Sequence, residues 1–575
     1  MKKLILFLLA AGLILSSCSQ QSAPSGSSSG SDPAASGGSS ASGKPDTWIA
    51  DRLIKGRLFV GDASAALPDD QINNPTAQKI KDLTGITLEW EYTAGNSDME
   101  VMSTCFASGD IPDIIVSYLD DSSRPEFSVL NKAAEEGMFA DLVPLFKDTK
   151  VYSKYLDPDY LPIDSYKNVF MRDEYQGKGY VVQLQVSREP GSQPRDGISL
   201  YMNSTIADSI GVEPGSIKSS EDLFAAARKI KDGGFTDANG NPVMPIGPTV
   251  WGGRLEPSLY MSSAISSGRD TVFGVFDGKV SHISNTPYML DEVNIVRQGL
   301  SEGLMDPEIF TMSDARAEEG FLNRHYGFMV MTNWQAVDKY YKTGVKYLPV
   351  INMADAYGNS DVYVKSKSPW LAWAISSKAE NPEEIVKFAD FMASPEGKLI
   401  WMYGTEGETY DLDADGKPSI KKELFDLKDS DSQSALQYNL YALGSWWGRA
   451  IGFTDLAPYE DFGEWNIGDK LNPEKAALSQ ELFDYGDPKI TYYDGFPAAT
   501  FLNDMPEDLQ TNLKQFLDPS YFSEVFVQAC FANSEDEAAG IIKDFRALLE
   551  KQGVVEFENY LQKVYDENPE TIHFH

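Results

Sequence analysis

The stretch Ala107-Ser108-Gly109-Asp110-Ile111-Pro112-Asp113-Ile114-Ile115 joins a helical pattern to an extended one. Met99–Ala107 has the apolar spacing of a helix, and Ile111–Val116 is a short apolar run typical of a buried strand. Asp113 follows Pro112 at the start of this strand, where we predict a structural role for its carboxylate. The stretch therefore predicts a helix that turns directly into an inner strand of a sheet.

Helical and extended patterns alternate outward from this stretch along the rest of the chain. Helix starts are indicated by capping residues, by Pro at the first helical position and by a capping box. Such signals predict helix starts at Thr76, Ser219 or Ser220, Asn381-Pro382, Ser394-Pro395 and Ser534–Glu537. Alternating apolar residues predict a strand over Ile86–Tyr92. Short strands between helices predict an α/β fold with open sheets, each covered on both faces.

The amino terminus has the pattern of a secretory signal. Lys2 and Lys3 precede the apolar run Leu4–Leu15, which is too short to span a bilayer comfortably. The following Leu15-Ser16-Ser17-Cys18 resembles a bacterial lipobox, which implies a signal peptide over residues 1–17 and lipidation of Cys18. We therefore expect an extracytoplasmic lipoprotein anchored to the outer face of the cell membrane. The alternative is an uncleaved anchor helix with an incidental cysteine.

The segment after Cys18 has a composition that disfavours folding. Up to residue 47 it is mostly Ser, Gly, Ala and Pro, so it buries too little apolar surface to offset the entropy of ordering. We expect residues 18–47 to form a flexible linker with an r.m.s. span of roughly 30 Å. The remaining chain, residues 48–575, is long enough for large hydrophobic cores.

The composition excludes several classes of protein. The chain has 86 acidic and 49 basic residues, a formal charge of −37, which disfavours binding to nucleic acid or to anionic lipid. Cys105 and Cys530 lie in apolar helix-like runs, so we favour buried free thiols over a disulfide, although pairing stays open. The sequence has no HExxH, Walker A or dinucleotide-binding motif. We expect a protein that is not an enzyme, with a glycosidase-like carboxylate pair as the alternative.

One acidic stretch matches part of a calcium-binding loop. Asp411, Asp413, Asp415 and Gly416 fit the first half of an EF-hand pattern, but Lys422 stands where the closing Glu belongs. The same stretch fits a β-hairpin with an Asp-Gly turn. We favour the hairpin.

A second stretch offers weaker calcium ligands. Asp237, Asn239 and Asn241 alternate as oxygen donors, but Pro242 follows and no acid closes the loop. We therefore expect no cofactor, and these three residues are the candidates if calcium is bound.

The stretch around Asp110 resembles the A-S-G-D-x-P-D signature of family 1 extracellular solute-binding proteins, the receptors of sugar-importing ABC transporters. Other pieces resemble the family in the same order and cover nearly all of residues 48–565. They are Leu200–Asn203, Gly327–Met331 with Trp334, Trp370–Ile375 with Asn381-Pro382-Glu383, and Ser394–Gly397. The similarity is greatest to the large lipoprotein subgroup that binds complex carbohydrates.

The resemblance implies a periplasmic-binding-protein-like fold, with two lobes, a hinge and a central ligand cleft. We place lobe 1 roughly at 48–195 and 345–400, and lobe 2 roughly at 196–344 and 401–575. It also implies a monomeric receptor that binds an oligosaccharide or sugar-containing solute and delivers it to the permease subunits of an ABC importer. The alternatives are a surface-attached glycan-degrading enzyme and a receptor of the same fold for peptides or other nonsugar solutes.

The candidate ligand-binding residues follow from the chemistry of a sugar, which presents apolar C–H faces and a rim of hydroxyls. Trp251 and Arg254 put an indole and a guanidinium in a Gly-containing loop. Asn333 and Trp334 combine an amide and an indole just after a buried strand, where loops of an α/β sheet form the ligand crevice. For each indole, a place in the core is the competing interpretation.

Three further aromatic residues complete the candidate set. Trp446 and Trp447 are adjacent, and we expect that two neighbouring indoles cannot both face one core. Tyr118 lies just beyond the strand Pro112–Ser117. We include all three as ligand-binding candidates.

Cys18→Ala tests the lipoprotein hypothesis. The variant should keep its ligand affinity, because the thiol lies outside the folded region, but should be lost from the membrane fraction because no acyl chain holds it there. Fractionation of cells followed by immunoblotting measures retention, with the wild-type chain as control. A variant that stays with the membrane would contradict lipid anchoring through Cys18.

Overall fold

The computed structural model describes most of the chain after residue 43. The described residues are 44–61, 66–92, 98–184, 186, 198–249, 272–276, 278–350, 363–366, 371–412, 414, 416, 418–454, 478, 481–482, 490–493, 495–517 and 519–569. The expected signal peptide, the lipidated Cys18 and nearly all of the expected linker therefore lie outside the described residues. Within these ranges, no helix is both long and apolar enough to cross a membrane.

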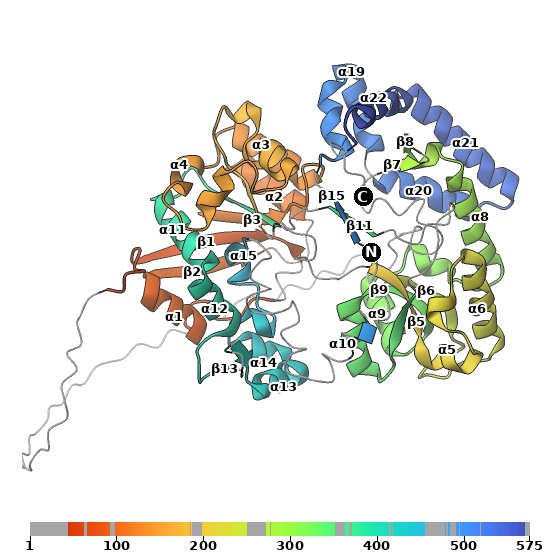
Figure 1. The fold of residues 1–575 in the computed structure, drawn as a ribbon, viewed down its shortest axis with the longest axis horizontal. Coiled ribbons are helices and arrows are strands. Elements are labelled where there is room, and N and C mark those ends of the chain that lie inside the picture. Colours follow the sequence, from red (N-terminus) through yellow and green to blue (C-terminus); the bar gives the residue numbers. More distant parts are fainter. Residues whose placement is uncertain are drawn as a thin grey trace, which may run out of the picture. The chain divides into compact units, whose positions relative to one another are not determined.

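The first sheet has five strands in the order β2-β1-β3-β12-β4. Figure 1 labels β1, β2 and β3, which lie side by side. They are β1 (Arg52–Phe59), β2 (Ile86–Tyr92), β3 (Ile114–Tyr118), β4 (Val182–Leu184) and β12 (Leu371–Ile375). β1 pairs in parallel with β2 and β3, whereas β12 runs antiparallel to β3 and β4. The carboxyl ends of β1, β2 and β3 therefore lie along one edge of this sheet.

Helices cover both faces of the first sheet. Successive residues of a strand point to opposite faces, so the residues of β3 show what covers each face. Ile114 and Val116 of β3 belong to the first core, a cluster that also contains Trp373, whereas Ile115 belongs to a separate cluster. The first core includes residues of α1 (Pro75–Thr84), α11 (Pro382–Ala393) and α12 (Pro395–Tyr403), and the cluster around Ile115 includes residues of α2 (Asp98–Ser108) and α3 (Pro125–Glu135) (Figure 1). Burial on both faces confirms the prediction from the sequence.

The second sheet has four strands in the order β10-β5-β9-β6. They are β5 (Ile198–Asn203), β6 (Met244–Thr249), β9 (Tyr326–Thr332) and β10 (Tyr347–Val350). β6 and β9 are parallel, and β5 runs antiparallel to β9 and to β10. Leu200 and Met202 point into the second core, and Tyr201 points to the opposite face.

Helices also cover both faces of the second sheet. Those that contribute to the second core include α5 (Ser204–Ile210), α6 (Ser220–Asp232) and α8 (Tyr288–Ser301), and those on the opposite face are α9 (Asp314–Leu322) and α10 (Asn333–Thr343) (Figure 1). The α/β class predicted from the alternation of helical and extended patterns is therefore confirmed for both sheets.

Smaller sheets and further helices complete the described fold. The paired strands are β7 (Phe273–Phe276) with β8 (Lys279–His282), β11 (Tyr363–Ser366) with β15 (Ile490–Tyr493), and β13 (Tyr410–Leu412) with β14 (Pro418–Ile420). The helices are α4 (Val143–Phe146), α13 (Lys422–Ser430), α14 (Ser432–Leu436), α15 (Arg449–Gly452), α19 (Glu507–Leu513), α20 (Pro519–Cys530), α21 (Glu535–Lys551) and α22 (Val554–Glu567). The antiparallel pairing of β13 with β14 confirms the hairpin that we favoured over an EF-hand.

The two cores divide the chain differently from the predicted lobes. Trp401, Leu443 and Phe453 belong to the first core, so residues 401–453 pack with the first sheet and not with the second lobe as predicted. β10 pairs with β5, which places residues 347–350 with the second sheet and not with the first. An apolar helix face shows that a helix is buried, but it does not show which sheet buries it.

The helix ends show which local signals were correct. Ser219 and Ser394 cap α6 and α12 as predicted, each accepting a hydrogen bond from a backbone N–H. α1 is capped by Asn74 and not by Thr76, which lies inside the helix. At α21, Ser534 caps the helix through the Glu537 N–H, but the Glu537 carboxylate accepts from Asn533 N–H, outside the predicted capping box.

Both cysteines of the described region are buried and free, as predicted. Cys105 lies on α2 and Cys530 ends α20. Burial raises the pKa of each thiol above its ordinary value, so both stay protonated near neutral pH.

Side chains of α22 satisfy the backbone of β8. His282 N–H donates to Glu558 Oε1 and Val280 N–H donates to Gln562 Oε1, each at 2.6 Å. The imidazole of His282 is also buried, and its Nδ1 accepts from Ser284 N–H at 3.1 Å. Burial lowers the pKa of His282 to about 3, so the folded protein holds this ring neutral.

The low pKa of His282 predicts a loss of stability on mild acidification. The unfolded ring titrates near its ordinary value of about 6.5, so between pH 7 and pH 5 the unfolded state gains a proton that the folded state does not. The free energy of unfolding should fall by about 2 kcal/mol over this interval from His282 alone. Urea denaturation at both pH values measures the free energy of unfolding of the wild type and of His282→Asn. If this free energy fell by the same amount between pH 7 and pH 5 in both proteins, the prediction would be refuted.

Candidate ligand-binding site

A polar loop follows β3 at the edge where the parallel strands of the first sheet end. Residues 119–124 leave β3 after Tyr118 and lead into α3, which begins at Pro125. The loop contains two aspartates, two serines and an arginine. In open α/β sheets, ligands bind in the crevice outside the carboxyl ends of the strands. This loop therefore lies where proteins with open α/β sheets contact a ligand.

Arg124 is held in this loop by two carboxylates and an aromatic ring. Its Nε and Nη2 donate to the two oxygens of Glu126, each at 3.2 Å, and its Nη1 lies 3.3 Å from Asp120 Oδ2. The guanidinium carbon lies 5.6 Å from the ring centroid of Tyr118. These contacts fix the guanidinium beside a partly exposed aromatic ring, which is an arrangement suited to a polar ligand with an apolar face.

A buried carboxylate organises the next part of the site. Asp164, 4% exposed, accepts from Ser122 N–H at 2.8 Å through Oδ2 and from Ser122 Oγ–H at 2.6 Å through Oδ1. Its Oδ1 also accepts from Asn168 Nδ2 at 2.6 Å. Asn168 belongs to the π-helical turn η3 (Ser165–Phe170). Asp164 thus orients Ser122 and Asn168 relative to each other.

Ser122 and Asn168 together hold the hydroxyl of Thr500, which lies in η9 (Ala498–Asp504). Because the Ser122 hydroxyl donates to Asp164, its oxygen is the acceptor for Thr500 Oγ1 at 3.1 Å. Asn168 Nδ2 donates to the same Thr500 oxygen at 3.3 Å. The Ser122–Asn168 pair therefore presents one acceptor and one donor, the combination that a single hydroxyl group requires.

Gln183 of β4 fixes the backbone of the same loop. Its Nε2 donates to the carbonyl of Leu119 at 2.8 Å and to that of Asp120 at 3.3 Å. The side chain is 2% exposed, and its Oε1 is buried with no hydrogen-bond partner among the described residues. The loop is therefore anchored to a neighbouring strand through its main chain, which leaves its side chains to the site.

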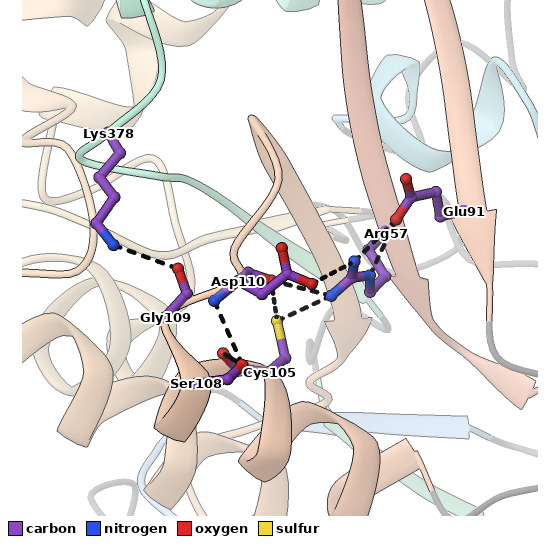
Figure 2. A network of polar contacts seen from close by, with 7 residues as sticks. All are labelled: Arg57, Glu91, Cys105, Ser108, Gly109, Asp110 and Lys378. Atoms are coloured by element: carbon purple, nitrogen blue, oxygen red, sulfur yellow. Dashed lines mark hydrogen bonds and ion pairs between the residues drawn. The ribbon is translucent and has the colours of Figure 1, made fainter.

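The signature stretch around Asp110 lies at the opposite end of β3 from this loop. Arg57 of β1 donates to the Asp110 carbonyl at 3.0 Å and pairs with Glu91 of β2 at 2.8 Å. Figure 2 shows these side chains meeting beside the start of β3. The Cys105 thiol donates to the same carbonyl at 3.0 Å and accepts from Arg57 Nη1 at 3.2 Å. Lys378 Nζ donates to the Gly109 carbonyl. The motif fastens α2 and the start of β3 to the neighbouring strands.

Asp113 completes this fastening and confirms the structural role predicted for it. Its Oδ2 accepts from Lys55 N–H at 3.0 Å, and its Oδ1 pairs with Arg52 at 3.3 Å. Both partners belong to β1, which is the strand beside β3. The most family-specific stretch of the sequence is therefore an anchor of the sheet and lies away from the polar loop.

The structure brings few of the predicted site residues together. Tyr118 is part of the polar loop site. Trp251 and Arg254 lie outside the described residues. Asn333 and Trp334 begin α10, directly after β9, as expected for residues at a strand end, but their side chains are not among those described.

Trp446 and Trp447 correct a physical premise of the prediction. Both belong to the first core, with 8% and 1% of their surface exposed, so two adjacent indoles do face one core. Trp447 Nε1–H donates to the Leu88 carbonyl at 3.0 Å, and Arg449 stacks 4.4 Å from the Trp446 ring centroid. The two indoles lie in the segment between η8 (Tyr441–Leu443) and α15, where no regular helix or strand forces successive side chains apart. In this conformation Trp447 has no face for a ligand.

Sequence reasoning missed most of the polar loop site. Asp120, Ser122 and Arg124 carried a usable signal, because charged and hydroxyl residues directly follow a buried strand. Asp164 and Asn168 had no such signal, since both come from an irregular segment far from β3 in the chain. The Thr500 contact spans 378 positions, and no local pattern encodes it.

The structure has two mixed sheets, each covered by helices on both faces, and the chain passes between them more than once. This is the architecture of a two-lobe solute-binding fold. Residues 69–399 match the family model of the bacterial extracellular solute-binding proteins, and the chain belongs to this family. It is therefore a solute-binding protein that works outside the cytoplasm. No curated protein shows a significant match to the chain.

Solved structures share the fold at low sequence identity. An alginate-binding protein determined without calcium ion has a TM-score of 0.62 and 20% identity, with 91% of this chain and 100% of that chain covered. The Streptococcus pneumoniae ABC-transporter substrate-binding protein FusA, as an EF-hand mutant in complex with fructo-nystose, has a TM-score of 0.62 and 17% identity over 90% and 99%. An HMO-binding, ABC-transporter-associated solute-binding protein from Bifidobacterium longum infantis gives 0.56 and 17% over 91% and 99%.

The donor set of the Asp237 loop shows whether this loop fits calcium, the ion for which the sequence made it a candidate. Asp237 Oδ1 accepts from the N–H groups of Asn239 and Asn241, and Oδ2 accepts from Asn241 Nδ2 and lies 3.1 Å from His325 Nδ1. Calcium takes oxygen ligands, but the groups around the Asp237 carboxylate are N–H donors and a histidine nitrogen. The loop therefore fits a hydrogen-bonded turn and not a calcium site. Across the described ranges, no three His, Cys, Asp or Glu side chains gather to hold a metal.

Asp113→Ala tests the structural role of Asp113 at the start of β3. The variant should lose about 1–3 kcal/mol of unfolding free energy, because Lys55 N–H and Arg52 lose their acceptor. Asp110→Ala is the matched control within the same motif. The Asp110 carboxylate is 81% exposed and 3.4 Å from Arg57, so its loss should cost no more than about 0.5 kcal/mol. Urea denaturation measures both, and equal losses would contradict the assignment.

Proposed function

We propose that this protein is the oligosaccharide receptor of an ABC importer, held on the outer face of the cell membrane by lipids on Cys18. It captures a sugar-containing solute between its two lobes and delivers it to a membrane permease. It acts as a monomeric binding protein without a cofactor and without catalysis of its own. The polar loop after β3, with Tyr118 beside the fixed Arg124, is the observation that carries this proposal.

The chemistry of the loop matches what a sugar presents. Tyr118 offers a partly exposed ring to an apolar sugar face, and the partly exposed Asp120 carboxylate is a strong acceptor for hydroxyl donors. The Ser122–Asn168 pair already holds the hydroxyl of Thr500. A site that holds a protein hydroxyl in this way has the donor and acceptor needed for the hydroxyl of a ligand.

The ligand contacts from the second lobe are proposed from the sequence. Trp251, Arg254, Asn333 and Trp334 supply two indoles, a guanidinium and an amide, of which Asn333 and Trp334 begin α10 at the carboxyl end of β9. Proteins of the same fold bind alginate, fructo-nystose and HMO, which favours a carbohydrate over a peptide ligand. For Trp446 we propose at most a small contact with the ligand, since only 8% of its surface is exposed.

The permease would distinguish the loaded receptor from the empty one by recognising the closed arrangement of the lobes. To shift a two-state equilibrium from 1:99 to 99:1, the ligand must favour the closed form by about 5.5 kcal/mol. The flexible linker expected at residues 18–47 would keep the receptor near the permease at high effective concentration. Repeated delivery then needs no new diffusional search through the medium.

Tyr118→Ala is the sharpest test of the proposed site. The variant should weaken oligosaccharide binding by about tenfold or more, because it removes the ring that faces the sugar, and Trp334→Ala should act in the same direction. The measurements are the ligand-induced thermal shift, and compaction by small-angle scattering, of the purified mature chain against a panel of neutral, acidic and branched glycans and of peptides.

Tyr438→Ala is the matched control, because Tyr438 is also a partly buried tyrosine packed against the first core. Its ligand affinity should equal that of the wild type. A mature chain that responds to peptides and to no glycan would refute the carbohydrate ligand. Release of reducing ends from polysaccharide by the purified chain would refute a purely binding role.

A further inference from the structure

We propose that the polar loop site selects neutral oligosaccharides and discriminates against those that carry carboxylates, such as uronic or sialic acids. This inference rests on the proposed function and adds the charge class of its ligand. It is carried by the contacts of Arg124 and by the balance of charges around Tyr118.

Arg124 is the cation of this loop, and carboxylates of the protein already engage it. Each of its three guanidinium nitrogens faces a carboxylate oxygen, two of them on Glu126 in a parallel fork and one on Asp120. Glu126 is 8% exposed, so the fork is largely shielded from water and little weakened by solvent. An anionic sugar would have to displace these carboxylates to reach the same N–H donors.

The formal charges around the site favour the same conclusion. Asp120, Asp121, Glu126 and Asp164 carry four negative charges against the one positive charge of Arg124, a formal total of −3. Arg172, which donates to the Asn168 carbonyl, is paired with Glu174, so these two charges leave the total unchanged. Asp121 and Asp164 are each 4% exposed and accept hydrogen bonds from backbone N–H, hydroxyl and amide groups. A ligand carboxylate near Tyr118 would therefore meet like charges in a partly desolvated setting, where their repulsion is strong.

The hydrogen-bonding chemistry of the loop also separates the two ligand classes. A neutral sugar brings many hydroxyl donors, and the partly exposed carboxylate of Asp120 is an acceptor only. A sugar carboxylate brings acceptors, which acceptors of the protein cannot satisfy. The formal charge of −37 of the whole chain adds a long-range field that disfavours the approach of anions.

This selectivity differs from that implied by the description of one protein of the same fold. Alginate is a polymer of uronic acids, and the alginate-binding protein shares this fold at 20% identity. Fold therefore leaves the charge class of the ligand open, and the residues of the site decide it.

Matched pairs of sugars that differ only in charge test the inference. Isothermal calorimetry on the mature chain would compare β-linked mannotriose with the corresponding mannuronate trisaccharide, galactotriose with galacturonate trisaccharide, and lacto-N-neotetraose with its sialylated derivative. In every pair that binds, the neutral member should bind at least about tenfold more tightly. An acidic member that binds equally well or better would overturn the selectivity and leave the receptor role intact. A lack of binding in all pairs and in the wider glycan panel would overturn the proposed function itself.

Substitutions that remove charge but keep shape test whether the loop is responsible. The double variant Asp120→Asn with Glu126→Gln releases Arg124 and should reduce the preference for neutral sugars by about tenfold, through tighter binding of the acidic member. Asp426→Asn is the control, because it removes one carboxylate from an exposed ion pair with Lys422 on α13. The control should leave the preference unchanged.

The single variant Asp120→Asn keeps the Glu126 fork and replaces the double variant if the latter fails to fold by circular dichroism. It should reduce the preference in the same direction by a smaller factor. A folded variant with an unchanged ratio of neutral to acidic affinity would overturn the role of this loop in selectivity.

Discussion

Where β3 enters the first sheet, the Asp113 carboxylate accepts hydrogen bonds from Lys55 N–H and from Arg52, and the Asp110 carbonyl beside it is held by Arg57 and by the Cys105 thiol. These contacts fix the register of β3 against β1, and through it the direction in which the strand leaves the sheet. Because a one-residue slip would turn every β3 side chain to the other face, the position of the polar loop depends on this anchor. The anchor stabilises one end of the strand, and the other end is left to contact a ligand.

This division explains how a widely shared fold can serve different ligands. The contacts of the anchor join the side chains of Asp113, Arg57 and Cys105 to β1 and to the start of β3, and none of them involves the polar loop. The loop at the far end is fixed mainly through its main chain, by Gln183 and Asp164. Its side chains can therefore differ between proteins without disturbing the sheet, and in this chain they form an acceptor-rich surface beside Tyr118.

Local sequence signals were reliable for the elements and unreliable for their partners. Strands such as β2 and caps such as Ser219 and Ser394 were predicted correctly because capping and period-two alternation act within a few residues. The lobe assignment of residues 401–453 was wrong, and so was the premise that Trp446 and Trp447 could not share a core. Both errors concern which surface a buried face meets, and apolar patterning is silent on that question.

The sequence by itself determined the α/β class, the family resemblance, the positions of several helices and strands and the structural role of Asp113. Each of these depends on residues that are close in the chain or on a conspicuous local motif. Only the tertiary structure decided that Asp164 organises Ser122 and Asn168, that Arg124 is held by two carboxylates beside Tyr118, and that Thr500 reaches this site from 378 positions away. The physical reason is that these contacts are made by side chains brought together through the pairing of strands and the packing of cores, so their geometry exists only after the chain has folded.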